Sequence, residues 1–170
     1  MKSNGAPAPP PQGSIKILLA DDDKDDLFFF SMALESLTVP TQLAIVMDGE
    51  KLMVYLDENS HQLPDVLFLD LNMPRKNGFE CLNEIKLNNS LNKLPVIIYS
   101  TSFEQDVVNQ LYKNGAHYFI RKPAEFSQLK KLIQQTVAIL MRDLPIGNSG
   151  NILQPTIENF VLTLENSLVN

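Results

Sequence analysis

Residues 66–74 read Val-Leu-Phe-Leu-Asp-Leu-Asn-Met-Pro, an apolar run that ends in a single carboxylate, Asp70. The four apolar residues before that carboxylate are typical of a strand buried on both faces of a sheet. Pro74 and the Asn77–Gly78 pair predict a loop before the next helical pattern. A carboxylate at the end of a buried strand is costly unless a metal, a cation or a reaction compensates it. The stretch therefore predicts a buried strand that places Asp70 at a functional edge.

The same arrangement, an apolar run followed directly by a polar group, occurs at three other places in the chain. These are Asp21 and Asp22 after residues 15–20, Ser100 after residues 95–99, and Lys122 after residues 117–121. Taken singly, each has an ordinary explanation, such as a solvated helix start, a helix cap or a strand end. Their repetition at four strand ends indicates one shared site.

Predicted strands and helices alternate five times between residues 15 and 142. Strands are expected at 15–20, 43–47, 65–69, 95–99 and 117–121, and helices at about 24–37, 49–56, 78–87, 104–114 and from 125 onward. Near-continuous apolar strands between helices indicate a parallel sheet covered on both faces, and the chain is too short for an eight-unit barrel. We expect an α/β fold: a flavodoxin-like, doubly wound (βα)5 unit with a five-stranded parallel sheet in the order 2-1-3-4-5.

In a sheet of this order, the ligand crevice lies outside the carboxyl ends of strands 1 and 3. Asp21, Asp22 and Asp70 follow those two strands. Three converging carboxylates cannot all stay ionised without a cation, and oxygen ligands without His or Cys favour Mg²⁺, with Mn²⁺ as the other candidate. Lys122 adds a positive charge and Ser100 a hydroxyl donor, so Asp70 is equipped to accept a phosphoryl group as an acyl phosphate.

Composition excludes several classes of protein. The chain has 170 residues, 44% of them apolar and 20% charged, which fits one globular domain with tails. A net charge of −6 argues against a nucleic-acid partner, and no apolar run approaches the about 20 residues of a membrane span. Cys81 is the single cysteine and no secretory signal is present, so we expect a cytoplasmic protein without a membrane or nucleic-acid partner.

The two ends of the chain differ from its middle. Residues 1–14 are rich in proline and are expected to be a disordered leader, residues 15–142 form the domain, and residues 143–170 form a tail. The tail has an apolar spacing that predicts a short amphipathic helix with one face made of Ile157, Phe160, Val161, Leu164 and Leu168. That face could pack on its own domain, pair with a second copy or bind a target, so a monomer or a weak homodimer is expected.

At these residues the sequence resembles the response regulator receiver domain, the phosphoryl-accepting module of two-component signalling. The resemblance covers about residues 15–142 and rests on four motifs in family order. They are Ile-Leu-Leu-Ala-Asp-Asp-Asp at 17–23, Leu-Asp-Leu-Asn-Met-Pro at 69–74, Pro-Val-Ile-Ile-Tyr-Ser at 95–100, and Phe-Ile-Arg-Lys-Pro at 119–123. The family fold is the one that the alternation of strands and helices predicts.

The resemblance implies a metal-binding role for the acids. Asp22 and Asp70 would bind Mg²⁺ through their side chains, and Asn72 would bind it through its backbone carbonyl. Asp21 would act through a metal-bound water. Asp70 would take the phosphoryl group from a phosphohistidine on a sensor histidine kinase or a phosphotransfer protein.

The resemblance also implies a conformational switch. Ser100 and Lys122 would hold the phosphoryl oxygens, and the aromatic ring of Phe119 would follow Ser100 inward. The surface of the fourth helix, fifth strand and fifth helix would then change its affinity for an unidentified protein target. The Lys122–Pro123 peptide bond would be cis, as it usually is in the family, and Phe119 stands where the family often has Tyr.

We expect a stand-alone receiver that is not an enzyme, apart from phosphorylating and dephosphorylating its own acceptor Asp. Two alternatives stay open. A phosphatase of the haloacid-dehalogenase type also combines an Asp nucleophile, Mg²⁺ and a parallel sheet, but it needs a second acid where this chain has Asn72. A receiver that cannot be phosphorylated and serves only as a scaffold is disfavoured, because every group that the reaction needs is present.

Overall fold

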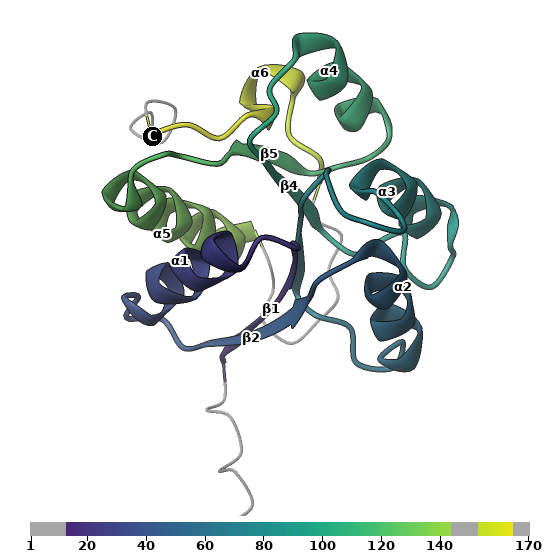
Figure 1. The fold of residues 1–170 in the computed structure, drawn as a ribbon, viewed down its shortest axis with the longest axis horizontal. Coiled ribbons are helices and arrows are strands. Elements are labelled where there is room, and N and C mark those ends of the chain that lie inside the picture. The colour runs from purple at the N-terminus through teal and green to yellow at the C-terminus, as the bar shows by residue number, and fades with distance from the viewer. Residues whose placement is uncertain (1–12, 144–152, 165–170) are drawn as a thin grey trace, which may run out of the picture.

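The computed structural model describes residues 13–143 and 153–164 (Figure 1). One sheet of five parallel strands has the order β2-β1-β3-β4-β5. The strands are β1 (Ile15–Ala20), β2 (Thr41–Val46), β3 (Val66–Leu69), β4 (Val96–Ser100) and β5 (Tyr118–Arg121). The helices are α1 (Lys24–Glu35), α2 (Gly49–Glu58), α3 (Gly78–Leu87), α4 (Gln105–Lys113), α5 (Phe126–Asp143) and α6 (Ile157–Phe160). The predicted doubly wound α/β fold with strand order 2-1-3-4-5 is confirmed.

Helices cover both faces of the sheet, α1 and α5 on one side and α2, α3 and α4 on the other (Figure 1). Successive strand residues face opposite sides: in β3, Leu67 and Leu69 pack toward α2–α4, whereas Phe68 packs toward α1 and α5. Burying one such side chain contributes about 1.5–3 kcal/mol, so the two apolar layers fix which helix lies on which face.

Side-chain caps fix the starts of the two helices that follow the acid-bearing strands β1 and β3. The Asp23 carboxylate accepts hydrogen bonds from the backbone N–H groups of Asp25 and Asp26 at the start of α1. Asn77 and Glu80 form a reciprocal capping box at the start of α3. These caps therefore anchor the helix end of each loop that carries an acid.

Residues 153–164 run along α4 and β5 (Figure 1). The helix predicted for the tail is wrong beyond Phe160, because α6 is a single turn and Val161 forms a parallel bridge with Phe119. The backbone N–H of Leu162 donates to the Phe119 carbonyl at 2.9 Å. An extended backbone after Phe160 therefore pairs with the outer edge of β5, which a continued helix could not do. Leu168 and most of the predicted leader at 1–14 lie outside the described residues.

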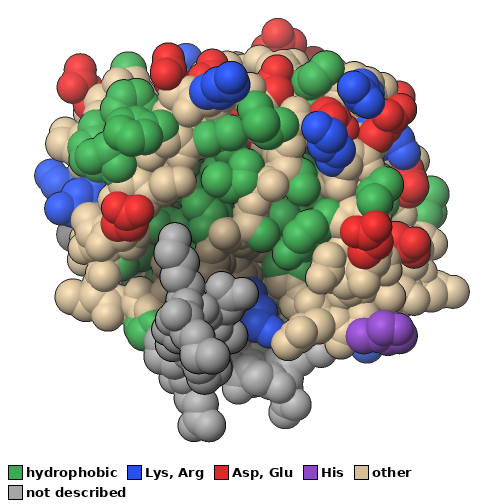
Figure 2. Space-filling view, turned by 60° about the horizontal axis from the view of Figure 1, so that its bottom comes forward, with side chains coloured by type: hydrophobic (Ala, Val, Ile, Leu, Met, Phe, Trp, Pro, Cys, Tyr) green, Lys and Arg blue, Asp and Glu red, His purple; other side chains and the backbone are tan. Residues whose placement is uncertain are grey.

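The surface seen in Figure 2 mixes acidic and basic side chains, with hydrophobic side chains exposed between them. No helix within residues 13–143 or 153–164 is both long and apolar enough to cross a membrane. Cys81 is buried in α3, and burial raises the pKa of its thiol to about 12, so it packs as a small apolar residue.

Candidate functional site

Strand register brings the polar strand ends to one edge of the sheet. Ala20 of β1 pairs with Leu69 of β3, so the acids that follow each of them emerge side by side. The Asp70 backbone N–H donates to the Ala20 carbonyl at 2.9 Å, and the Lys122 N–H donates to the Ser100 carbonyl at 2.9 Å. The ends of β1 and β3, and those of β4 and β5, are therefore each joined by a backbone hydrogen bond at the point where the polar side chains begin.

Asp21, Asp22 and Asp70 form one acidic cluster. Each offers a carboxylate oxygen, and these oxygens lie within 4.8 Å of one another. Asp21 and Asp70 are buried, whereas Asp22 is exposed. Carboxylate oxygens at this spacing, with one side open to solvent, suit a hard divalent cation that keeps part of its water shell.

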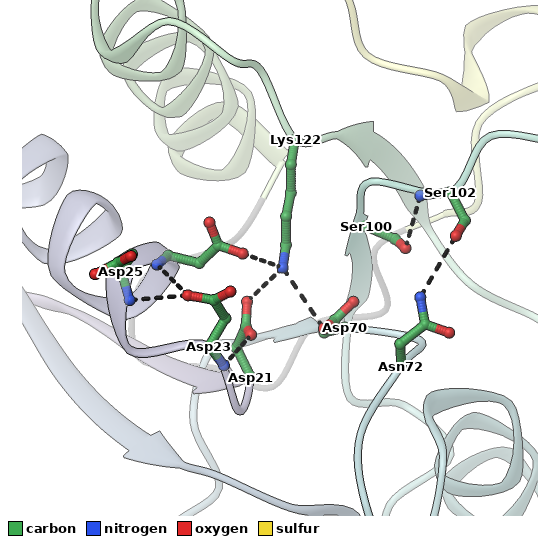
Figure 3. Close-up of polar contacts among 9 residues, drawn as sticks. Asp21, Asp23, Asp25, Asp70, Asn72, Ser100, Ser102 and Lys122 are labelled. Carbon is green, nitrogen blue, oxygen red and sulfur yellow. Dashed lines mark hydrogen bonds and ion pairs between the residues drawn. The ribbon is translucent and has the colours of Figure 1, made fainter.

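Lys122 lies between the acids of the β1–α1 segment and Asp70 (Figure 3). Its Nζ is 2.7 Å from a carboxylate oxygen of Asp21, 2.7 Å from one of Asp26 and 3.5 Å from one of Asp70, and its side chain is only 6% exposed. Burial disfavours the ammonium, but the hydrogen bonds to Asp21 and Asp26 and the charges of Asp21 and Asp70 together outweigh it and raise the pKa of Lys122. The amine is therefore held charged inside the site.

The buried acids do not receive enough positive charge from this one lysine. Burial raises the pKa of Asp70 to about 6, although the charge of Lys122 opposes the shift. Burial also raises the pKa of Asp21, against the hydrogen bond from Lys122. One ammonium thus faces several carboxylates, and a second cation fits this donor set on chemical grounds.

Ser100 and Asn72 lie on the other side of Asp70 from the β1–α1 acids (Figure 3). The Ser100 hydroxyl, buried at the end of β4, accepts a hydrogen bond from the Ser102 N–H at 3.3 Å. The Asn72 side-chain amide donates to the Ser102 hydroxyl at 3.4 Å, which ties the loop after β3 to the loop after β4. The metal-binding role of the Asn72 carbonyl stays a prediction.

Phe119 is fully buried on β5, and its ring packs edge to face on Phe103 with centroids 5.7 Å apart. Its backbone, on the outer edge of the sheet, pairs with the tail. The expectation of a cis Lys122–Pro123 bond is wrong for this structure, since none of the described residues follows a cis peptide bond.

Sequence reasoning missed three residues at the site. Asp26 holds Lys122, and the ring of Tyr99 lies 5.1 Å from the Lys122 Nζ as a cation–π partner. Gly78 packs so closely that an added Cβ would lie 2.2 Å from the Asp70 carbonyl oxygen. A search for acids in the first helical turn would have found Asp26, but only the tertiary structure identifies the contacts of Tyr99 and Gly78.

Comparison with known proteins gives a consistent family assignment. The model of the response regulator receiver domain matches residues 17–134. Response regulator Rcp1 of Synechocystis sp. is 35% identical over 123 residues, which cover 69% of this chain and 83% of that protein. The probable methanogenesis regulatory protein FilR2 of Methanothrix harundinacea is 29% identical over 122 residues, covering 70% of this chain and 79% of that one.

Solved structures give the same result. The phosphorylated cyanobacterial phytochrome response regulator RcpA superposes with a TM-score of 0.72 at 33% identity, covering 79% of this chain and 99% of that one. The Mn²⁺-bound form of response regulator Rcp1 superposes with a TM-score of 0.71 at 30% identity over the same shares of both chains. Neither the phosphatase nor the scaffold alternative is favoured by these relatives.

Proposed function

The chain belongs to the response regulator receiver family of two-component signalling, and from this premise we propose that Asp70 is its phosphoryl acceptor. The observation that carries the proposal is the convergence of Asp21, Asp22 and Lys122 on Asp70, with the Lys122 Nζ 3.5 Å from the acceptor carboxylate. We assign residues 15–142 to the receiver, residues 1–14 to a leader and residues 143–170 to a tail. Apart from its own phosphorylation and dephosphorylation, the chain acts by protein contact.

In the proposed reaction, a carboxylate oxygen of Asp70 attacks the phosphorus of a phosphohistidine on a sensor histidine kinase or a phosphotransfer protein. The P–O bond forms as the P–N bond breaks, and the electron pair leaves with the imidazole nitrogen. Lys122, held by Asp21 and Asp26, offsets the negative charge on the transferred phosphoryl oxygens. The Ser100 hydroxyl, whose oxygen accepts from the Ser102 N–H, donates its own proton to one of these oxygens.

We assign the divalent cation to the side chains of Asp22 and Asp70 and to the Asn72 carbonyl, with Asp21 contributing mainly through a metal-bound water, Mg²⁺ as the physiological ion and Mn²⁺ as a substitute. Support comes from the oxygen-only donor set and from the Mn²⁺-bound form of Rcp1. When bound, the cation supplies positive charge that keeps the carboxylates ionised and offsets charge on the phosphoryl group.

The signal leaves the site through the switch pair Ser100 and Phe119. Movement of Ser100 toward the phosphoryl group changes the space beside the buried ring of Phe119, and hence the surface of α4, β5 and α5 that meets a protein target. The relatives named for phytochrome signalling support a histidine kinase of the phytochrome class as the phosphoryl donor. Transfer from such a kinase, and none from an unrelated histidine kinase, would test that assignment.

Incubation with acetyl phosphate and Mg²⁺, followed by intact-protein mass spectrometry, tests the acceptor. We expect one acid-stable, base-labile phosphoryl adduct on the wild type and none on Asp70→Asn or in EDTA. Asp65→Asn is the matched control, because Asp65 precedes β3 and accepts a hydrogen bond from the Lys16 N–H away from the site. An adduct of equal yield on Asp70→Asn would overturn the assignment.

A further inference from the structure

The outer edge of β5 and the adjoining side of α4 are occupied by the chain's own residues 153–164, which form the docked segment (Figure 1). An edge strand exposes a row of backbone N–H and C=O groups that can pair with any extended chain. Here the docked segment provides that pairing, through the bridge of Val161 with Phe119 and the Leu162 N–H bond to the Phe119 carbonyl.

Polar contacts fix the start of the docked segment. The side-chain amide of Gln154 donates to the carbonyls of Tyr112 at 2.6 Å and Ala116 at 2.7 Å, at the end of α4 and just beyond it. The Tyr112 hydroxyl donates to the Pro155 carbonyl at 2.9 Å. The Tyr112 carbonyl also accepts a hydrogen bond from the Gly115 N–H at 3.0 Å, so the Gln154 amide adds a second donor there and ties the docked segment to the turn after α4.

Apolar contacts anchor its end. Phe160 is 0% exposed, and its ring packs edge to face on Tyr112 with centroids 5.3 Å apart. Phe160 and Val161 join the core layer of α2–α4, whereas Leu162 and Leu164 pack on the layer of α1 and α5. The docked segment therefore straddles the edge of the sheet and inserts side chains into both layers.

We propose that the α4–β5 edge is a docking site for an extended peptide and that residues 153–164 are its intramolecular occupant. A partner that uses this edge displaces the docked segment and reproduces its chemistry. That partner is a strand with a buried aromatic residue, an aliphatic residue two positions later and a backbone N–H aimed at the Phe119 carbonyl. The assignment does not depend on phosphorylation of Asp70.

The occupied edge also borders the proposed phosphorylation site. A cavity of about 490 Å³ lies between the end of the docked segment and the β5–α5 loop, and Lys122, Pro123 and Phe103 are part of its lining. The residue that pairs with the docked segment, Phe119, is the proposed switch residue. The docking site and the switch therefore share Phe119. A movement of Phe119 would change how strongly an extended peptide pairs with the edge of β5.

A competition experiment on the full-length protein tests the proposal. A fluorescent peptide with the sequence of residues 153–164 is titrated with wild-type protein and with Phe160→Ala, and its binding is followed by anisotropy. Because Phe160→Ala loosens the protein's own segment, we expect it to bind the peptide at least about tenfold more tightly than the wild type. Phe28→Ala is the matched control, since Phe28 is 60% exposed on α1, and it should bind like the wild type.

A second peptide and a second measurement make the outcome decisive. A peptide carrying Phe160→Ala should not bind, and the Leu162 amide should exchange slowly in wild-type protein and rapidly in Phe160→Ala. Equal peptide affinity for wild type and Phe160→Ala, or rapid exchange of Leu162 in the wild type, would overturn the proposal. Protection of Leu162 that increases with protein concentration would also overturn it, by showing that the occupant comes from a second copy.

Discussion

At the carboxyl ends of β1 and β3 the molecule buries charged side chains, whereas along the edge of β5 it buries a phenylalanine and a paired backbone. Both regions adjoin Phe119 and the β5–α5 loop, but burial has opposite effects on folding stability in the two. Burial raises the pKa of Asp70 and Asp21, so ionisation of these two carboxyls at neutral pH opposes folding. Burial of Phe160 removes apolar surface from water and favours folding. Burial thus indicates a reactive site in the first region and a stabilising apolar contact in the second. Variants in the first region should change phosphorylation, and variants in the second should change stability.

The largest effect is expected from Lys122→Met. Loss of the ammonium 3.5 Å from the Asp70 carboxylate should slow phosphoryl incorporation from acetyl phosphate by about 100-fold or more. The measurement is the initial rate by intact-protein mass spectrometry, with a thermal scan to show that the variant folds. Lys130→Met, on the exposed side of α5, is the control and should keep the wild-type rate. A folded Lys122→Met protein with an unchanged rate would contradict the proposed role.

Phe160→Ala should affect stability rather than chemistry. Loss of a fully buried ring at the end of the docked segment should lower the free energy of unfolding by about 3–5 kcal/mol, measured by urea denaturation. Phosphoryl incorporation should stay within about threefold of the wild type, because the ring contacts α4 and not the acids. If Phe160→Ala abolished incorporation, the two regions would not be functionally separate.

Asp70→Asn should stabilise the metal-free protein at neutral pH. The folded-state pKa of Asp70 is about 6 against an ordinary value of 3.8, so between these values the folded state binds more protons than the unfolded state. Wild-type stability therefore falls as pH rises through this window, and above pH 6 the ionised carboxylate is a net cost. We expect Asp70→Asn to gain about 1–3 kcal/mol at pH 7.5 in EDTA.

The same comparison made at low pH should remove the gain. Near pH 4 the wild-type carboxyl is protonated in the folded state, so the stability difference between wild type and Asp70→Asn should shrink toward zero. Asp57→Asn, at an exposed position late in α2, should show no such pH-dependent gain. A gain that persisted unchanged to pH 4 would show that burial of the charge is not its cause.

The smallest expected effect is that of the metal. Mg²⁺ or Mn²⁺ at about tenfold above its dissociation constant should stabilise the wild type by about 1.4 kcal/mol, seen as a rise in melting temperature that EDTA reverses. Asp22→Asn, which removes one oxygen of the acidic cluster, should lose most of this rise. Asp25→Asn, an exposed acid nearby, should retain it. Equal shifts in both variants would place the cation elsewhere.

The fold was predictable because its determinants are local. Each strand is a short apolar run, and the first three helices begin at the capping side chains of Asp23, Asp48 and Asn77, so element order and strand ends follow from adjacent residues. Strand order then follows from the known preference of such sheets, and it brings Asp21, Asp22 and Asp70 to one edge. The boundaries differ by a residue or two where hydrogen bonding ends a strand or helix.

The tail was predicted less well because its pattern fits two structures. The spacing of Ile157, Phe160 and Leu164 suits a helix face, yet Phe160, Leu162 and Leu164 also alternate as a strand does. The outer edge of β5, which has no neighbouring strand of the sheet, favours the extended form, and no local sequence pattern reveals that edge. For the same reason the contacts of Lys122 with Asp26 and Tyr99 depend on tertiary packing that the sequence does not display.

The connection between α5, which ends at Asp143, and the docked segment, which begins at Leu153, has a consequence for recognition. A peptide tethered by so short a stretch has an effective concentration at its binding surface of roughly a millimolar, whatever the amount of protein. The concentration of a free competitor at micromolar level is about a thousandfold lower than this effective concentration. To displace the docked segment, the competitor must therefore bind the edge more tightly by about 4 kcal/mol. The tether therefore sets an affinity threshold that dilution does not lower, so weak or accidental strand-like ligands are rejected.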